Sequence, residues 1–214
     1  MNSELCHMRK NFYLINSIVY WLFMVIGFSD NWLYNTSQAS NFIPKFIVHG
    51  LFAFSWFSLL LVQTGFIRKN NHKAHQRVGI IGMIVFYGMI LSTGYLYVTR
   101  FLELGYLSPL TQMVFSQYIF AIVLITIGFA KRKTDAQTHK TNIAFGCLML
   151  MFPVIDRAIG HVFDDLYAII LLLTYLSLFG SFVWYYKKIK WQFVVGFIIW
   201  LTGILNMIII NGEI

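Results

Sequence analysis

The sequence predicts an all-helical membrane protein: a polytopic bundle of about seven transmembrane helices that forms a single domain over residues 1–214. Of the 214 residues, 58% are hydrophobic and only 11% are charged, and the mean hydropathy is +0.69. A soluble domain carries about 25% charged residues, so this composition suits the interior of a bilayer. Seven spans of about 20 residues each use most of the chain and leave short loops.

Apolar runs that are long enough to cross a hydrocarbon core of about 30 Å recur along the whole chain. They lie at residues 12–28, 44–66, 78–98, 111–130, 141–163, 166–186 and 191–210. Pro44 and Pro109 begin the second and fourth runs, where a missing N–H group leaves no helical bond unmade. Pro153 lies inside the fifth run and removes a backbone hydrogen bond there, which predicts a kink near residues 149–153.

Lysine and arginine predict the orientation of the chain. With the N-terminus inside, most of the 16 basic residues fall in cytoplasmic segments, which is the positive-inside pattern. These residues are Arg9, Lys10, Arg68, Lys69, Lys73, Arg77, Lys131, Arg132, Lys133, Lys140, Lys187, Lys188 and Lys190. We therefore expect a cytoplasmic N-terminus and an outside C-terminus in a bacterial inner membrane. The net charge of +8 is then a sign of this topology and does not indicate nucleic-acid binding.

Two histidines occupy matching positions on the predicted cytoplasmic side. His75 precedes the third run and His139 precedes the fifth, and each ends a basic segment. A pair of imidazoles from facing helices is what a b-type haem or a metal ion requires. His75 and His139 are therefore candidate ligands, and the alternative is that each is an ordinary interfacial histidine.

Polar and ionisable side chains also occur in the predicted outer half of several spans, where such residues are expensive and by default functional. They are His49, Ser92, Thr93, Asp156, Arg157, His161 and Asn206, with Gln117 nearer the middle of its span. Arg157 and His161 are four residues apart and share a helix face. We expect an outer polar cavity lined by His49, Asp156, Arg157, His161 and Asn206. The alternative for Asp156 and Arg157 is a local charge pair, or an arginine that snorkels outward.

A family resemblance rests on two of these segments. Residues 74–79 (Ala-His-Gln-Arg-Val-Gly) begin an apolar helix, and residues 138–140 (Thr-His-Lys) precede Arg157, which lies eighteen residues beyond His139. This pattern resembles a widespread family of uncharacterised bacterial membrane proteins with a His-Arg-x-x-Gly helix start and a later His and Arg at that distance. The likeness covers residues 45–160, and Gln76 departs from it by separating His from Arg.

That family is distantly similar to the four-helix, two-haem membrane cytochromes b. His49, Trp56 and Arg68 are faintly similar to the first haem-ligating helix of those proteins. The resemblance implies a haem-bearing core in the second to fifth spans. His139 and His161 are about 33 Å apart along a helix, which is too far for two stacked haems to share that helix. One haem or metal site therefore fits better, with His75 and His139 as inner ligands and His49 serving an outer site.

The leading interpretation is a redox-type membrane protein that binds haem b, or less readily copper or another metal, through His49, His75 and His139. Arg157 would contact an anion such as a haem propionate, a quinone oxygen or a lipid phosphate. Electron transfer, or assembly of a respiratory complex, is the expected role, with a quinone or that complex as partner. One alternative is a small-molecule or lipid transporter or binding protein that uses the outer cavity, and another is a metal-dependent enzyme acting on lipid. No known catalytic motif occurs, so we assign no catalytic residue.

Overall fold

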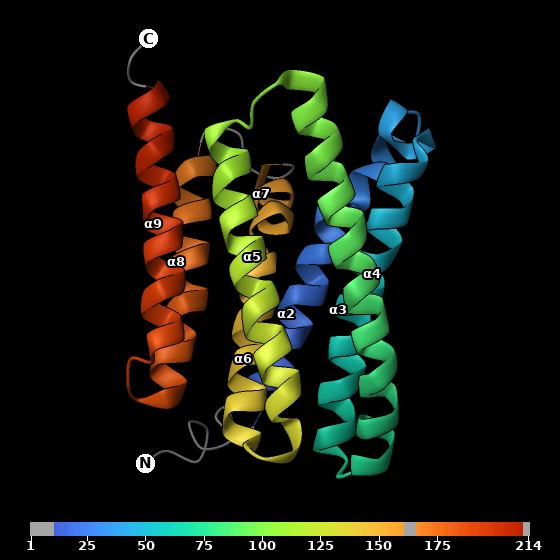
Figure 1. Ribbon diagram of the computed structural model, residues 1–214, viewed down its shortest axis with the longest axis vertical. Helices are drawn as coiled ribbons and strands as arrows, with labels where there is room; N and C mark the ends of the chain where they lie inside the picture. The colour runs from blue at the N-terminus through green and yellow to red at the C-terminus, as the bar shows by residue number, and fades with distance from the viewer. Residues whose placement is uncertain (1–10, 161–165, 212–214) are drawn as a thin grey trace. The chain divides into compact units, whose positions relative to one another are not determined.

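The computed structural model describes residues 11–160 and 166–211, and every regular element in these ranges is a helix (Figure 1). The prediction of an all-helical fold is confirmed. The chain divides into two compact units, Met1–Leu104 and Gly105–Ile214, and each is described by itself.

The first unit contains α2 (Phe12–Gly27), α3 (Pro44–Arg68) and α4 (His72–Leu104). A π-helical turn (Asp30–Tyr34) and a 3-10 turn (Ala39–Phe42) lie between α2 and α3. The next connection is much shorter, because Asn70 adopts a left-handed conformation with φ of 54° and reverses the chain at once. α3 therefore packs against α2 on one side and runs antiparallel to α4 on the other (Figure 1).

The second unit contains α5 (Pro109–Ala130), α6 (Ala136–Leu150), α7 (Phe152–Gly160), α8 (Tyr167–Tyr186) and α9 (Trp191–Asn211). α5 packs against both α6 and α9. The core between α6, α8 and α9 is aromatic, and the Phe145 ring lies 4.9 to 5.3 Å from the rings of Phe179, Phe182 and Phe193.

The predicted kink is present in this unit. α6 ends at Leu150, α7 begins at Phe152, and the two helix axes differ by 43°. Pro153 explains the break, since its ring nitrogen cannot donate to the carbonyl of the residue four positions earlier. The fifth predicted span is thus a bent pair of helices.

Within residues 11–160 and 166–211, five helices are long and apolar enough to cross a membrane, or six if the bent α6–α7 pair is one span. The described apolar part of α9, Trp191–Asn206, is shorter than these five. Several spans of this kind indicate a multi-pass membrane protein.

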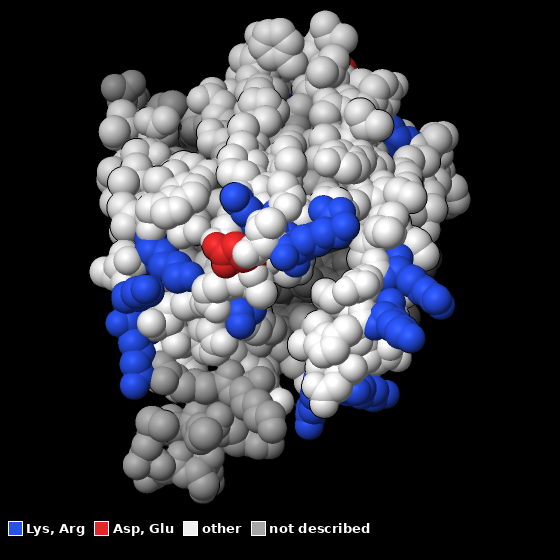
Figure 2. All heavy atoms as spheres, turned by 60° about the horizontal axis from the view of Figure 1, so that its bottom comes forward, with Lys and Arg blue, Asp and Glu red and all other residues white. Residues whose placement is uncertain are grey.

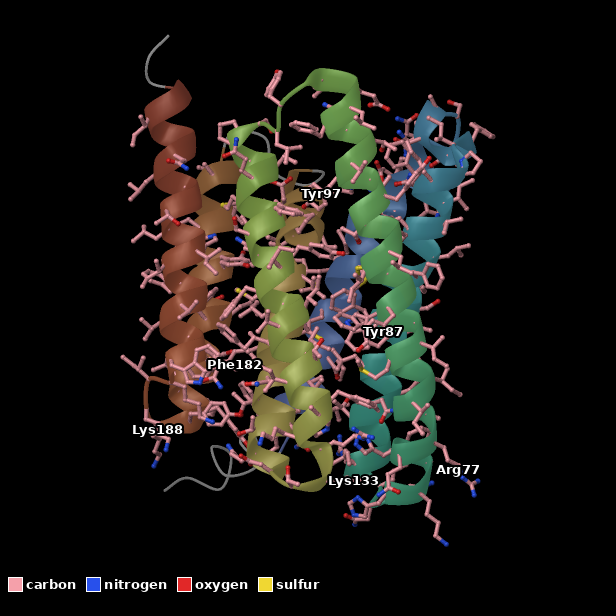
Figure 3. The ribbon with its side chains drawn as sticks, viewed as in Figure 1. Arg77, Tyr87, Tyr97, Lys133, Phe182 and Lys188 are labelled. Atoms are coloured by element: carbon pink, nitrogen blue, oxygen red, sulfur yellow. The ribbon has the colours of Figure 1, made fainter. Side chains whose placement is uncertain are left out.

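In each unit, basic side chains gather at the turns between helices (Figure 2). Those that are exposed are Arg68, Lys69, Lys73, Arg77, Lys131, Arg132, Lys133, Lys140, Lys187 and Lys188. The side chains of Arg77 and Lys188 extend away from the helix ends, whereas Phe182 lies among the helices (Figure 3). Most of the basic side chains are therefore at or near the helix ends.

Close packing of α5 on α6 depends on glycine at position 146. A Cβ atom there would lie 2.7 Å from Cγ1 of Ile125 and 3.3 Å from the carbonyl oxygen of Ala121. At Gly180 in α8, a Cβ atom would meet nothing within 4 Å. The two positions therefore form a matched pair for testing the interface.

We predict that Gly146→Ala lowers the thermal unfolding temperature of the purified protein, because overpacking typically costs about 1–3 kcal/mol. Gly180→Ala, which makes the same change in an open position, should leave that temperature unchanged or raise it slightly. Thermal unfolding in mild detergent measures both variants. Equal unfolding temperatures would show that the α5–α6 contact is looser than described.

Candidate functional site

His139 lies in the first turns of α6 and is oriented by the preceding helix. Its Nδ1 atom is 2.9 Å from the backbone carbonyl oxygen of Gly128 in α5. A carbonyl oxygen can only accept, so Nδ1 donates the hydrogen and the ring lone pair resides on Nε2. The approach needs glycine, since a Cβ at position 128 would be 3.1 Å from both the carbonyl oxygen of His139 and Cβ of Asn142.

Asp135 caps the helix that carries His139. Its carboxylate accepts hydrogen bonds from the N–H groups of Gln137 (3.0 Å) and Thr138 (2.9 Å), and the Thr138 hydroxyl donates to its second oxygen. The backbone N–H of His139 donates to the Asp135 carbonyl over 2.9 Å. The cap therefore fixes where α6 begins and on which side of the helix His139 lies.

His75 occupies the equivalent position in the first unit. Asn71 caps α4, because its side-chain oxygen accepts from the N–H of Ala74 (3.1 Å) and its carbonyl accepts from the N–H of His75 (3.1 Å). In both hairpins, α3–α4 and α5–α6, a half-buried histidine thus lies four residues after an Asn or Asp cap. His72, one turn earlier than His75, is exposed. Residues 74–79 were expected to begin a helix, and α4 does begin at His72, ahead of the apolar run at 78–98.

A third buried polar group lies between α6, α8 and α9. The hydroxyls of Thr141 and Tyr186 are 2.6 Å apart, and the Lys190 ammonium donates to the Thr141 hydroxyl over 3.1 Å. Beside them, the Gln192 amide nitrogen donates to the Asn142 amide oxygen over 2.9 Å. Sequence reasoning missed this cluster, although polar residues at the start of two apolar runs were a visible signal.

Farther along the second unit, Gln117 lies on a fully buried aromatic surface. Its side-chain oxygen accepts from the hydroxyl of Tyr175 over 3.2 Å, and the Tyr175 ring stacks on Trp200 with 5.2 Å between centroids. Gln117 and Tyr175 are 0% exposed and Trp200 is 2% exposed. The Gln117 amide is thus a buried hydrogen-bonded link between α5 and α8.

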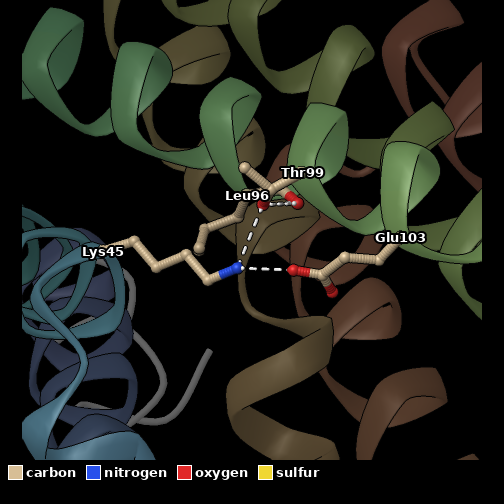
Figure 4. A network of polar contacts seen from close by, with 4 residues as sticks. All are labelled: Lys45, Leu96, Thr99 and Glu103. Carbon is tan, nitrogen blue, oxygen red and sulfur yellow. Dashed lines mark hydrogen bonds and ion pairs between the residues drawn. The ribbon is translucent and has the colours of Figure 1, made fainter.

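The far end of α3 carries the first part of the predicted outer site. Nδ1 of His49 lies 3.2 Å from the Thr93 hydroxyl and 3.4 Å from the Ser92 hydroxyl, both in α4. One turn closer to the end, Lys45 forms an ion pair with Glu103 at 3.0 Å and approaches the Thr99 hydroxyl at 3.4 Å (Figure 4). The polar side chains predicted at this depth of α3 and α4 do meet.

In the second unit, Asp156 accepts a hydrogen bond from the hydroxyl of Tyr167 in α8. Arg157, the next residue, is exposed on α7, and Asn206 is exposed on α9. His161 lies outside the described residues. Within this unit, Asp156 therefore contacts Tyr167. The outer polar cavity that was expected to include both Asp156 and His49 stays a prediction.

Residues 11–160 and 166–211 contain no group of three or more His, Cys, Asp or Glu side chains that could hold a metal ion. A bis-histidine site needs only two ligands. His75 belongs to the first unit and His139 to the second.

No protein-family model, curated protein or solved structure shows a significant match to this chain.

The Asp135 cap has a testable pH dependence. Hydrogen bonds from the side chain and backbone of Thr138, followed by that from Gln137, hold the pKa of Asp135 below its ordinary value of 3.8. A carboxylate with a lowered folded-state pKa stabilises the fold above the unfolded value, and that contribution is lost as the pH falls below it.

We therefore predict that Asp135→Ala lowers the unfolding temperature at pH 7 by a few degrees. The difference between this variant and the wild type should shrink as the pH is lowered below 3.8. Asp135→Asn retains a cap acceptor and is the matched control, with a smaller loss at pH 7. A difference from wild type that is independent of pH would contradict the role of the charged cap.

Proposed function

We propose that this chain is a redox-type membrane protein that binds haem b through histidines at the basic ends of its helices. The observation that carries the proposal is the orientation of His139 by the Gly128 carbonyl. Histidines that ligate metals almost always donate their other ring N–H to a carbonyl or carboxylate, which aims the remaining nitrogen at the metal. His75, at the matching distance from its own helix cap, is the proposed histidine ligand of the first unit.

The donor set of the described residues fits a haem better than a structural metal. Two imidazoles would suffice to hold a b-type haem, whereas copper or zinc sites usually need three or four protein ligands. A bound haem would supply one-electron redox chemistry, and a quinone or a respiratory complex would be the electron partner. In this proposal, Arg157 contacts an anionic group such as a propionate, and His49 serves the outer side.

The proposed topology has seven spans, with α6–α7 as one bent span and α9 as the last. The basic turns after α3, α5 and α8 then lie in the cytoplasm, and so does the N-terminus, as the positive-inside rule requires. This arrangement puts the His75 and His139 helix starts on the same side of a bacterial inner membrane.

A second candidate function is binding or transport of a small molecule or lipid in the outer half of the membrane. It is favoured by the contacts of His49 with Ser92 and Thr93, and by the bond between Tyr167 and Asp156. Ionisable groups that are held in apolar helices in this way commonly mark a substrate path. The metal-dependent lipid enzyme has less support, because the described residues contain no three-ligand metal group.

The haem proposal predicts a Soret band and reducible α and β bands in the protein purified in mild detergent. His139→Ala and His75→Ala should each lose most of the haem per protein, whereas His72→Ala should retain it. His72 is the matched control, because it is an exposed histidine about one helical turn before His75 in the same helix. Visible spectra, haem extraction and metal analysis of the four proteins make the measurement.

A colourless, metal-free wild-type protein from haem-supplemented cells would overturn the redox proposal. Equal haem content in the His72, His75 and His139 variants would overturn the assignment of the ligands. Ligand binding or uptake that depends on Asp156 and not on His75 or His139 would then favour the outer-site function.

A further inference from the structure

The connection between α2 and α3 exposes large apolar side chains. Trp32, Leu33 and Tyr34, in its π-helical turn, are 54%, 70% and 82% exposed, and Phe42, just before α3, is 71% exposed. Apolar side chains that gather on a surface commonly mark contact with a membrane or with another molecule. This composition is unusual for a loop that is surrounded by water.

The same connection carries no charge. Residues 31–44 contain no Asp, Glu, Lys or Arg, whereas the turns after α3, α5 and α8 contain lysines at positions 69, 131 and 188. Charged groups are the costliest ones to move out of water. A connection without them loses little when it enters the membrane, and it offers no ion pair to a soluble partner.

α2 is too short to cross the membrane by itself. Its 16 residues give a helix about 24 Å long, and the hydrocarbon core is about 30 Å thick. Two basic residues, Arg9 and Lys10, precede α2 in the sequence, and charges of this kind stay at the membrane surface. The apolar stretch continues to Tyr34, where the candidate span ends. The residues after α2 must therefore complete the crossing, which puts Trp32 and Leu33 close to the edge of the hydrocarbon core.

Asn41 takes the place of water for part of this backbone. Its side-chain amide nitrogen donates hydrogen bonds to the carbonyl oxygens of Asn31 and Thr36, both at 3.0 Å, and the carbonyl oxygen of Asn35 lies 3.3 Å away. The side-chain oxygen of Asn41 accepts from the side-chain amide of Asn31. Within the backbone, the N–H group of Asn35 donates to the carbonyl of Asp30 over 2.7 Å. Because a bilayer offers backbone groups few water partners, irregular backbone near its core needs internal hydrogen bonds of this kind.

We propose that residues 31–43 lie in the membrane surface and bind lipid, with Trp32, Leu33 and Phe42 inserted among the headgroups and the first carbons of the acyl chains. Tryptophan and tyrosine are enriched at this depth, because their rings are apolar and carry one polar group. Trp32 is held there by α3, since its ring lies 5.4 Å from that of Phe54. This inference is independent of the haem proposal and needs no assignment of inside and outside.

The patch continues the surface that α2 and α3 present to lipid. Ile26, in the last turn of α2, and Phe46, in the first turn of α3, are 42% and 41% exposed. These apolar side chains adjoin the connection on both sides. Between them, the exposed tip at residues 35–37 is Asn-Thr-Ser, and these polar side chains face water in the proposal. The bilayer, and not a second protein, is therefore the proposed partner of the patch.

Nitroxide labels on single cysteines test this depth in the full-length protein. The labels replace Leu33 and Phe42 in the patch, Ser37 at the tip and Leu91, a 74% exposed residue of α4, after Cys6 and Cys147 are changed to alanine. With the protein in phosphatidylcholine vesicles, collision with oxygen reports exposure to lipid, and collision with a water-soluble nickel chelate reports exposure to water. We expect the oxygen-to-nickel ratio at positions 33 and 42 to be several times that at position 37 and to approach that at position 91.

Asn41→Ala tests the hydrogen bonds that hold the connection at this depth. It should raise the access of nickel to a label at position 33, because the carbonyls of Asn31 and Thr36 lose their donor and turn toward water. Asn35→Ala is the matched control, since it removes an exposed amide from the same connection and should leave that access unchanged.

A ratio at positions 33 and 42 equal to that at position 37 would overturn the proposal, because the patch would then lie in water. Labels at positions 33 and 42 that are immobile and shielded from both reagents would also overturn it, and would assign the patch to contact with protein, such as a second copy of this chain. Equal nickel access at position 33 in the Asn41→Ala and Asn35→Ala variants would overturn the role of Asn41.

Discussion

The structure depends on one constraint, which is that a bilayer core offers no water to hydrogen-bond the backbone. Each spanning segment must satisfy its own N–H and C=O groups, so the apolar runs of this chain fold as helices. The same constraint moves charge to the helix ends, where Arg68, Lys133 and Lys188 are exposed. It also requires partners for the polar side chains that stay inside, as Tyr175 provides for the Gln117 carbonyl. The candidate sites follow from this constraint, because the polar side chains of such a fold lie at the helix ends or in hydrogen-bonded pairs between helices.

Helix caps connect that constraint to function. The first N–H groups of a helix have no internal acceptor, and Asn71 and Asp135 supply one at the starts of α4 and α6. Each cap fixes the start of its helix, so His75 and His139 lie four residues beyond the caps at corresponding positions. The two caps thus explain why the proposed ligands occupy corresponding positions, each in the first turns of its own helix. The glycine at position 128 then lets α5 approach closely enough for its carbonyl to orient the His139 ring.

Hydropathy and proline predicted much of the fold from the sequence. The second run was expected at 44–66 and α3 is Pro44–Arg68, and the kink at Pro153 is confirmed. Residues 74–79 were expected to begin a helix, and α4 begins two residues earlier, at His72, directly after the Asn71 cap. The contact of His49 with Ser92 and Thr93 agrees with their predicted common depth. The polar residues of the Lys190 cluster were visible in the sequence, but their contacts were not predicted, because helix packing joins residues 45 to 50 positions apart.

The most direct test of this account is the side of the membrane on which the basic turns lie, because the proposed haem ligands must share that side. Single cysteines can replace Lys69, Lys133 and Lys188, with Ser37 and Tyr106 as the opposite positions, after Cys6 and Cys147 are changed to alanine. A membrane-impermeant maleimide applied to spheroplasts should label positions 37 and 106 at once, and the three basic turns only after permeabilisation. Labelling of position 69, 133 or 188 in intact spheroplasts would contradict the topology and, with it, the common cytoplasmic location of these ligands.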